Sequence, residues 1–151
     1  SMSRVAPQTP GITSGIPHTR VPQRHTIFLA IGAGLAETLN CAVIYGGFNA
    51  VDYSGYPDCR PEFMAIMREA LNMASKRYVE GKGGLEIRTP LIGMTKSEII
   101  QLGQKLGVPF ELTWSCYYGR GEACGECDSC RIRLAGFRSA GLRDPLKYEG
   151  Y

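Results

Sequence analysis

Four of the six cysteines in this chain lie close together, at Cys116, Cys124, Cys127 and Cys130. The last three form two overlapping Cys-x-x-Cys units, and such a turn presents two thiolates to the same ion. Together with Cys116 they offer four thiolates, a set that suits the closed tetrahedral site of a structural zinc ion. The spacing therefore predicts a zinc ion that supports the local fold.

Other uses of these cysteines remain open. An iron–sulfur cluster is the main alternative to zinc, since sets of four cysteines also hold such clusters, although their usual spacings differ from this one. A thioredoxin-like redox pair fits less well, because neither Cys-x-x-Cys unit lies at a predicted strand-to-helix turn. Disulfides are disfavoured because the first residues carry no apolar export signal, so we expect a cytoplasmic protein with reduced thiols.

A second chemically rich stretch, "DYSGYPDCRPEF" (52–63), follows the carboxyl end of a predicted strand, where open α/β sheets bind their ligands. One interpretation is a turn-rich surface loop. The other is the rim of a pocket, in which Tyr53 or Tyr56 stacks on a planar ring. In that pocket Asp58 would accept hydrogen bonds from ring N–H groups and Arg60 would pair with a carboxylate.

Four single residues are also of interest. Arg24, at the entry to the first predicted helix, is either solvated or in reach of an anion. Lys96 lies in the first turn of a later helix, where its charge opposes the helix dipole, so it indicates either solvent exposure or a phosphate partner. For His25 we prefer a cap of the first helix over a role in a site. Cys41 precedes a buried strand, and we expect it to be a small core residue.

The elements that must position these residues follow from hydrophobic spacing and turn residues. Apolar residues at helical spacing predict a helix over 25–39, and a short apolar run predicts a buried strand over 42–45. The later elements expected are a helix from Pro61 to the "EGKGG" of 80–84, a strand over 85–91, a helix over about 96–106 with a Thr95–Glu98 capping box, and a last short helix over 131–141. We expect the tail, 142–151, to be polar and partly loose.

Strands that alternate with helices are typical of a parallel α/β sheet. The glycines at 32 and 34, inside the first predicted helix, suggest that it packs closely against this sheet. Two parallel strands do not make a stable sheet, so we expect the remaining strands to be missing or supplied by another chain. We divide the chain into an extended, proline-interrupted lead-in (1–24), a partial α/β domain (25–110) and a zinc-binding region with its tail (111–151). The net charge of +3 and the lack of a long apolar stretch favour neither direct nucleic-acid binding nor a membrane.

The stretches "VPQRHTIFLA", "GGFNAVDYSGYPDCRPEF", "TPLIGMTKSEII" and "SCYYGRGEACGECDSCRIRLAGF" together resemble the 7-cyano-7-deazaguanine synthase family of queuosine biosynthesis. The resemblance implies an adenine-nucleotide hydrolase-like α/β fold, Rossmann-like, with a parallel sheet that is incomplete at the N-terminus of this chain. It also implies an ATP-dependent ligase, with Mg²⁺, that converts 7-carboxy-7-deazaguanine and ammonia into 7-cyano-7-deazaguanine.

The resemblance further implies roles for individual residues. The residues that would line the deazaguanine site are Asp52, Tyr53, Ser54, Tyr56, Asp58, Cys59 and Arg60. Arg24 and Lys96 would face the ATP phosphates or the activated carboxylate, and the four clustered cysteines would bind one structural zinc ion. Catalytic residues stay unassigned. Members of the family are commonly homodimers, so a cytoplasmic homodimer without a membrane or nucleic-acid partner is expected.

The chain departs from the family pattern in three respects. The family's SGGxDS loop, whose backbone N–H groups cradle pyrophosphate, does not occur in it. His25 stands where the family has Asn, and Arg20 replaces an aromatic residue. We therefore expect the carboxyl-terminal two-thirds of such an enzyme, inactive by itself. The alternative is a non-catalytic zinc-bearing module that binds a deazapurine or a partner protein, or one half of a split enzyme.

Overall fold

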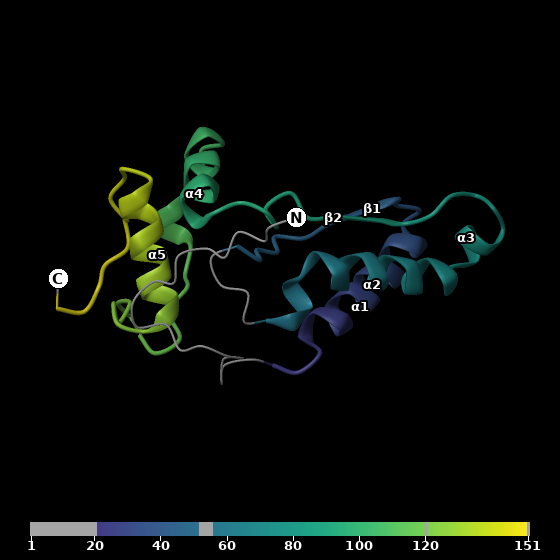
Figure 1. Ribbon diagram of the computed structural model, residues 1–151, viewed down its shortest axis with the longest axis horizontal. Helices are drawn as coiled ribbons and strands as arrows, with labels where there is room; N and C mark the ends of the chain where they lie inside the picture. The colour runs from purple at the N-terminus through teal and green to yellow at the C-terminus, as the bar shows by residue number, and fades with distance from the viewer. Residues whose placement is uncertain (1–20, 52–55, 120, 151) are drawn as a thin grey trace, which may run out of the picture. The chain divides into compact units, whose positions relative to one another are not determined.

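The computed structural model describes residues 21–51, 56–119 and 121–150 (Figure 1). These residues form two compact units, one that ends at Gly93 and one that begins at Met94. Most of the expected lead-in lies outside the described residues, Arg20 included. The expected division of the chain at residue 110 remains a prediction. No helix of the described part combines the length and the apolar character that crossing a membrane requires.

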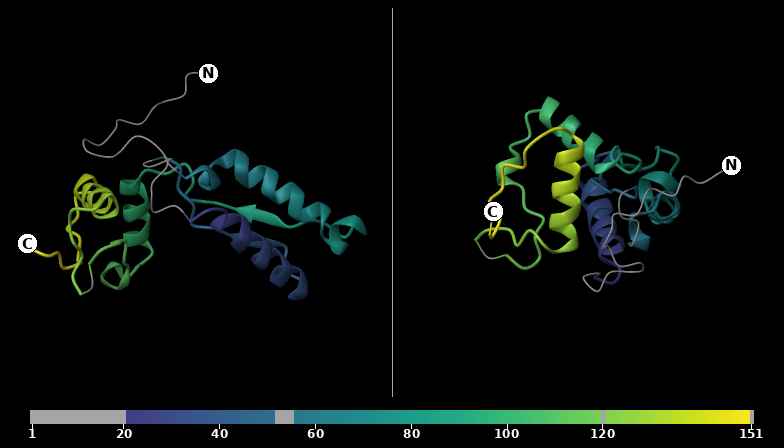
Figure 2. Two further views of the ribbon diagram at one scale, coloured as in Figure 1. Left: turned by 90° about the horizontal axis from the view of Figure 1, so that it is seen from below. Right: turned by 60° about the vertical axis from the view of Figure 1, so that its left-hand side comes forward.

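The first unit is built around a pair of parallel strands. Its elements are α1 (Arg24–Thr38), β1 (Val43–Tyr45), the short 3₁₀ helix η1 (Pro57–Cys59), α2 (Pro61–Met73), α3 (Lys76–Val79) and β2 (Glu86–Arg88). Ile44 of β1 lies opposite Ile87 of β2. Helix α1 contacts β1 and α2 contacts β2, and both helices lie along the same side of the strand pair (Figures 1 and 2). The predicted α/β class with a parallel sheet is therefore confirmed.

Helix α2 begins as the sequence predicts but ends earlier. Pro61 occupies its first turn, whereas the helix stops at Met73 and the chain continues as the separate four-residue helix α3. The buried Asn72 accounts for this break. Its side chain accepts a hydrogen bond from the backbone N–H of Leu85 (2.6 Å) and donates one to the Leu85 carbonyl (3.0 Å). Two hydrogen bonds thus link the end of α2 to the residue that precedes β2.

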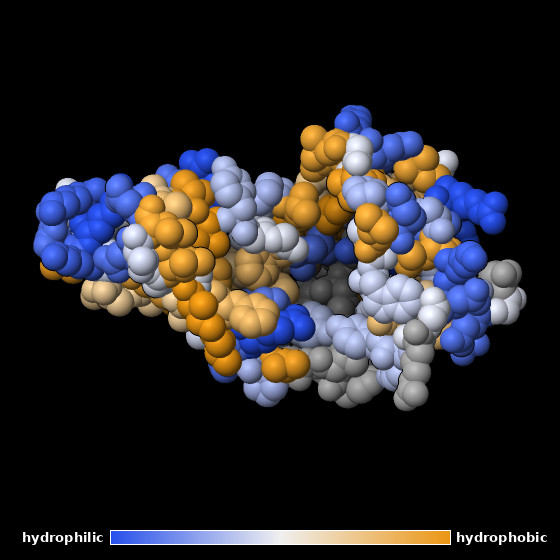
Figure 3. Space-filling view, turned by 180° about the vertical axis from the view of Figure 1, so that it is seen from behind, coloured by the Kyte–Doolittle hydropathy of each residue, from blue (hydrophilic) through white to orange (hydrophobic). Residues whose placement is uncertain are grey.

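The apolar residues that predicted α1 do not form its buried face. Ile27, Phe28, Ile31, Leu35 and Leu39 are exposed in the described part of the chain, whereas Leu29 and Ala36 are buried. Exposed apolar side chains are visible in orange in Figure 3. The predicted close packing is confirmed for Gly32, because a Cβ atom there would lie 3.4 Å from the side chain of Ile44 in β1. It is wrong for Gly34, where a Cβ atom would meet no atom of the described residues within 4 Å.

Cys41 is exposed, so the expectation that it is a core residue is wrong. The physical reason is its place in the turn between α1 and β1. Asn40 adopts a left-handed conformation (φ 56°), which reverses the chain after α1. Because β1 begins only at Val43, Cys41 lies before the strand and takes no part in its packing. The expectation of a buried strand is also wrong, since Val43 and Ile44 are half-buried and Tyr45 is exposed.

The second unit contains α4 (Lys96–Lys105), the 3₁₀ helix η2 (Phe110–Leu112) and α5 (Asp128–Ser139). The predicted capping box of α4 is confirmed: Thr95 accepts from the backbone of Glu98, and the Glu98 side chain accepts from the backbone of Thr95. Helix α4 packs directly on α5. A Cβ atom on Gly136 of α5 would lie 3.0 Å from the Ile100 side chain, so glycine permits this close approach.

Helix α5 starts before the predicted first residue 131, because Cys127 serves as its N-cap and Asp128 as its first residue. The metal-ligand motif and the helix therefore overlap.

The tail is also ordered against this unit, which contradicts the expected loose end. Tyr148 pairs with Ala123 in an isolated parallel bridge, and the Ala123 backbone bonds to Lys147 and Glu149 (2.9 Å each). Tyr148 is buried with Cys116, Ala123 and Cys130 in one cluster.

Candidate metal centre and ligand site

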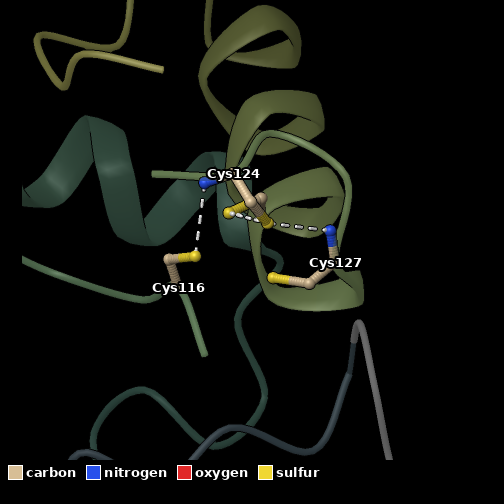
Figure 4. Close-up of side chains that lie close together, drawn as sticks. Cys116, Cys124 and Cys127 are labelled. Carbon is tan, nitrogen blue, oxygen red and sulfur yellow. Dashed lines mark hydrogen bonds between the residues drawn. The ribbon is translucent and has the colours of Figure 1, made fainter. Parts of the chain in front are cut away.

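The four clustered cysteines meet in space, and their sulfur atoms all lie within 4.8 Å of one another. Cys116 follows η2, Cys124 follows the bridge at Ala123, and Cys127 and Cys130 belong to the first turn of α5. Figure 4 shows Cys116, Cys124 and Cys127 with their sulfur atoms turned toward a common point. Among the described residues these cysteines form no disulfide.

Backbone N–H groups surround the sulfur of Cys116. The sulfur accepts hydrogen bonds from Tyr118 (3.4 Å), Gly119 (3.1 Å) and Cys124 (3.3 Å). Burial by itself raises the pKa of the Cys116 thiol, but these donors outweigh burial and lower the pKa to about 6. A Cβ atom on Gly119 would collide with the Glu122 carbonyl oxygen, so the tight loop that supplies the donors needs glycine there.

The same arrangement extends to Cys124, whose sulfur accepts from the backbone N–H of Cys127 at 3.4 Å (Figure 4). Metal ligands must be deprotonated, and hydrogen bonds to thiolate sulfur favour that form and orient it. Four soft sulfur donors that converge on one point fit a metal ion with no open coordination position. The residues present thus fit a structural metal centre.

The second candidate site lies where η1 meets the start of α1. Asp58 of η1 is only 6% exposed, and within the described part of the chain its Oδ1 atom is buried without a hydrogen-bond partner. Its Oδ2 atom accepts from the backbone N–H of His25 at 3.3 Å and lies 2.9 Å from Nδ1 of the His25 ring. A carboxylate next to a helix N-terminus is favoured by the helix dipole. Asp58 therefore stabilises the start of α1 from 33 residues away.

The preferred interpretation of His25 as the cap of α1 is wrong. Gln23 occupies the N-cap position in a left-handed conformation, and Arg24 is the first residue of the helix. His25 lies one residue further in, and its own backbone N–H is one of the donors that Asp58 satisfies. Its ring instead contacts the edge of the Phe48 ring, at 4.9 Å between centroids. Sequence reasoning missed Phe48, which carries no polar signal.

Arg24 and Tyr56 complete this site. A guanidinium nitrogen of Arg24 lies 3.4 Å from Nε2 of His25, and the guanidinium carbon lies 5.7 Å from the centre of the Tyr56 ring. A cation over an aromatic face is attracted by the ring quadrupole. The structure thus brings Arg24, Tyr56 and Asp58 together, as an anion- and ring-binding site would require.

The thiol of Cys59 lies 3.7 Å from Nδ1 of His25. Burial raises the pKa of Cys59, and the charge of Asp58 raises it further, while Arg24 acts in the opposite direction. The net rise keeps Cys59 a thiol at neutral pH. Cys59 therefore fits the wall of the site better than it fits an activated nucleophile.

For the remaining predicted site residues, a role in this site stays a prediction. The Arg60 side chain is exposed. Asp52, Tyr53 and Ser54 lie outside the described residues. Lys96 is the first residue of α4 in the second unit, where its stem packs over Gly136. Its expected contact with nucleotide stays a prediction.

Comparison with known proteins gives this architecture a family. The fold defines an α/β protein with parallel strands and a carboxyl-terminal cysteine centre. The model of the family "Queuosine biosynthesis protein QueC" matches residues 3–141, so the chain belongs to that family and has its Rossmann-like, adenine-nucleotide hydrolase-like fold. This confirms the resemblance and the fold inferred from the sequence.

Curated relatives carry the name 7-cyano-7-deazaguanine synthase. The protein of Pelobacter propionicus is 56% identical over 93% of this chain, which covers 63% of that protein. The protein of Picrophilus torridus is 54% identical over 93% of this chain, and the match covers 58% of that protein. The protein of Cellvibrio japonicus is 56% identical over 90% of this chain, and the match covers 61% of that protein. The chain thus spans about three fifths of the length of the curated relatives it matches.

Proposed function

We propose that this chain is the base-binding and metal-binding part of a 7-cyano-7-deazaguanine synthase. The reaction proposed is the ATP-dependent conversion of 7-carboxy-7-deazaguanine and ammonia into 7-cyano-7-deazaguanine. ATP activates the carboxylate, ammonia displaces the activated group, and the resulting amide is dehydrated to the nitrile. The names of the relatives support the reaction, and the site around Asp58 supports the part assigned to this chain.

The unpartnered Oδ1 atom of Asp58 is the observation that carries the proposal. A buried acceptor without a donor costs about 1–3 kcal/mol, and more when it is charged, unless a ligand supplies the donor. A guanine-like base presents ring and amino N–H groups on one edge, which suits a carboxylate acceptor. The half-buried Tyr56 ring beside it offers a face for stacking.

Arg24 is proposed to attract the anionic part of the reactants, either the carboxylate of the base or a phosphate. Its guanidinium is fixed between His25 and the Tyr56 ring rather than paired with a carboxylate in the described part of the chain. Lys96 is proposed to contact the nucleotide, with Mg²⁺ bound to the ATP phosphates. A lysine at the first position of α4 lies where an anion would also find helix N–H groups.

The metal of the cysteine centre is proposed to be zinc with a structural role. Four thiolates without an open position leave no room for a reacting water or substrate. The chain is further proposed to act in the cytoplasm, where thiols stay reduced, and as a homodimer.

The Asp58 assignment is tested by calorimetric titration with 7-carboxy-7-deazaguanine. Asp58→Asn is expected to weaken binding at least about tenfold, because hydrogen bonds to a charged group are worth about 1.5–3 kcal/mol. Glu62→Gln is the matched control, since it makes the same change at an exposed carboxylate in the first turn of α2. Equal affinity of the two variants, or no binding by the unchanged chain, would contradict the proposal.

A second experiment separates the synthase from the alternative of a non-catalytic binding module. The chain is incubated alone with Mg-ATP, ammonia and 7-carboxy-7-deazaguanine, and the nitrile is measured by mass spectrometry. We expect no nitrile, because the sequence contains no SGGxDS motif to cradle the pyrophosphate. Nitrile formation only after a second chain with that motif is added would favour a split enzyme. Nitrile formation by the chain alone would contradict the expected inactivity.

A further inference from the structure

The two ring nitrogens of His25 face groups of opposite charge. Nδ1 lies 2.9 Å from Oδ2 of Asp58, and Nε2 lies 3.4 Å from a guanidinium nitrogen of Arg24. The ring is only 14% exposed and the Asp58 side chain 8%, so water does not replace these contacts easily. The contact with Phe48 covers a further part of the ring.

These contacts determine where the ring can carry its proton. A guanidinium group only donates hydrogen bonds, so Nε2 must accept and cannot bear a hydrogen. Two groups lie near Nδ1: the Asp58 carboxylate, which only accepts, at 2.9 Å, and the Cys59 sulfur at 3.7 Å. The carboxylate is nearer and charged, so it places the hydrogen on Nδ1. A doubly protonated ring would direct the Nε2 hydrogen at the Arg24 cation. We infer that His25 is held as the neutral Nδ1–H tautomer and acts as a positioning residue that fixes Asp58 and Arg24 together.

This role explains which oxygen of Asp58 is left for a ligand. The backbone N–H of His25 donates to Oδ2, and ring Nδ1 lies 2.9 Å from the same oxygen. Oδ1 is therefore the atom left without a partner among the described residues. On the other side, Nε2 and the Tyr56 ring hold the Arg24 guanidinium in one place. This inference rests on the proposed function: His25 orients the Asp58 carboxylate toward the N–H groups of the base, and it orients the Arg24 guanidinium toward the carboxylate of the base.

A metal ion is the competing explanation for the same residues. The possible ligand atoms of His25, Asp58 and Cys59 lie within 4.8 Å of one another. A metal ion at Nδ1 would need a free lone pair on that nitrogen, which the Nδ1–H tautomer does not have. The proton would then lie on Nε2 and face the Arg24 guanidinium. The cation beside the ring and the protonated thiol of Cys59 both oppose a bound divalent ion. The metal is therefore an outcome that the test must be able to detect.

The tautomer is tested directly by ¹H–¹⁵N correlation spectra of the histidine rings in the zinc-loaded chain at neutral pH. The sequence has two histidines, and a His18→Gln variant assigns the signals. We expect a protonated Nδ1 and an unprotonated Nε2 at residue 25, unchanged when Co²⁺ is added beyond the cysteine centre. A protonated Nε2, or a cobalt–thiolate absorption band that disappears in Cys59→Ser, would overturn the inference.

Three substitutions test the positioning role through the affinity for 7-carboxy-7-deazaguanine. An asparagine at this position would place its amide near the position of Nδ1, and a glutamine would place its amide near that of Nε2. His25→Asn therefore retains the donor to Asp58, whereas His25→Gln does not. We expect His25→Asn to stay within about threefold of the unchanged chain, and His25→Gln and His25→Ala to bind about tenfold more weakly. Equal affinity of all three would overturn the positioning role.

The outcomes distinguish this inference from the proposed function. If the unchanged chain does not bind the deazapurine, the proposed function fails, while the ring spectra still decide the tautomer. If the base binds and the ring carries its proton on Nε2, the proposed function stands and the role of His25 is wrong. Because the spectra use the unchanged sequence at position 25, a variant that fails to fold does not prevent this decision.

Discussion

Cys127→Ser is expected to unfold most of residues 94–150 and to leave residues 21–93 folded. Cys127 is both a proposed zinc ligand and the N-cap residue of α5, and its backbone N–H bonds to the sulfur of Cys124. Structural zinc ions contribute an apparent free energy of about 10–16 kcal/mol in small peptides at neutral pH. Typical domains have a total stability of about 5–15 kcal/mol, so losing the metal exceeds what the remaining contacts supply.

The environment of the metal centre supports this large effect. The buried cluster of this unit consists of Cys116, Ala123, Cys130 and Tyr148, so two of its four members are themselves proposed ligands. Without the metal these sulfur atoms have no other covalent connection, because no disulfide joins the cysteines that the structure describes. Removal of zinc by a chelator is expected to have the same effect as the substitution.

The measurement combines metal analysis with two-dimensional amide spectra. We expect one zinc per chain in the unchanged protein and less than one in Cys127→Ser, together with collapse of the amide signals of residues 94–150. Cys41→Ser is the matched control, since Cys41 is an exposed cysteine outside the cluster. Iron in place of zinc would contradict the metal assignment. An unchanged melting temperature of Cys127→Ser would contradict the structural role.

Local signals in the sequence predicted the elements whose causes are local. The capping box of α4 needs only Thr95 and Glu98, which are three residues apart, and its prediction is confirmed. The same holds for Pro61 in the first turn of α2. The cysteine spacing likewise predicted that four ligands meet at one place, and the structure confirms it. Cys-x-x-Cys turns have a geometry that depends only on local residues.

The features that sequence reasoning missed depend on contacts between distant residues. Asp58 lies 33 residues from His25, and nothing in the spacing indicates that the carboxylate stabilises the start of α1. The apolar residues of α1 correctly predicted a helix, yet periodicity could not indicate which face of that helix is buried in this chain. Cys41 was misjudged for the same reason, since its burial depends on where β1 begins.

The ordered tail is another case of long-range contacts. "LRDPLKYEGY" is polar and contains Gly and Pro, a composition that is typical of a loose end. Asp144 and Tyr148 are nevertheless buried, because Arg133 of α5 provides a cation for them inside the unit. An arginine on a predicted short helix is normally assigned to the surface, so the sequence offered no signal for this pairing.

Arg133→Met is expected to lower the free energy of unfolding of the second unit by about 3–5 kcal/mol, the cost of leaving one partner of a buried ion pair alone. The guanidinium is bidentate to Asp144, with nitrogen–oxygen distances of 2.6 and 2.9 Å. It also donates to the Thr113 hydroxyl (2.7 Å) and the Phe110 carbonyl (3.1 Å). Removing it strands the Asp144 carboxylate, which then keeps only Tyr148 and the Leu146 backbone as donors within the described residues.

Chemical denaturation of the zinc-loaded chain measures this effect. Arg131→Met is the matched control, because Arg131 is exposed on the same helix. A double variant, Arg133→Met with Asp144→Leu, should recover part of the loss, since no buried charge is left unpaired. Equal stability of Arg133→Met and Arg131→Met would show that the ion pair contributes nothing to the fold.

The pH dependence provides an independent check on the same pair. Burial tends to raise the pKa of Asp144, but the hydrogen bonds from Arg133, Tyr148 and Leu146 together lower it below its ordinary value. The stabilisation is then complete above the ordinary pKa of an aspartate, about 3.9, and is lost as the pH falls through the lower pKa of the folded state. Acid also protonates the cysteine thiolates and releases the metal from both proteins, so the quantity to compare is the difference between their unfolding free energies while the metal is bound. Arg133→Met removes the main cause of the lowered pKa, so this difference should shrink as the pH falls. A difference that stays constant with pH in that range would mean that Arg133 does not hold the Asp144 carboxylate in its charged form.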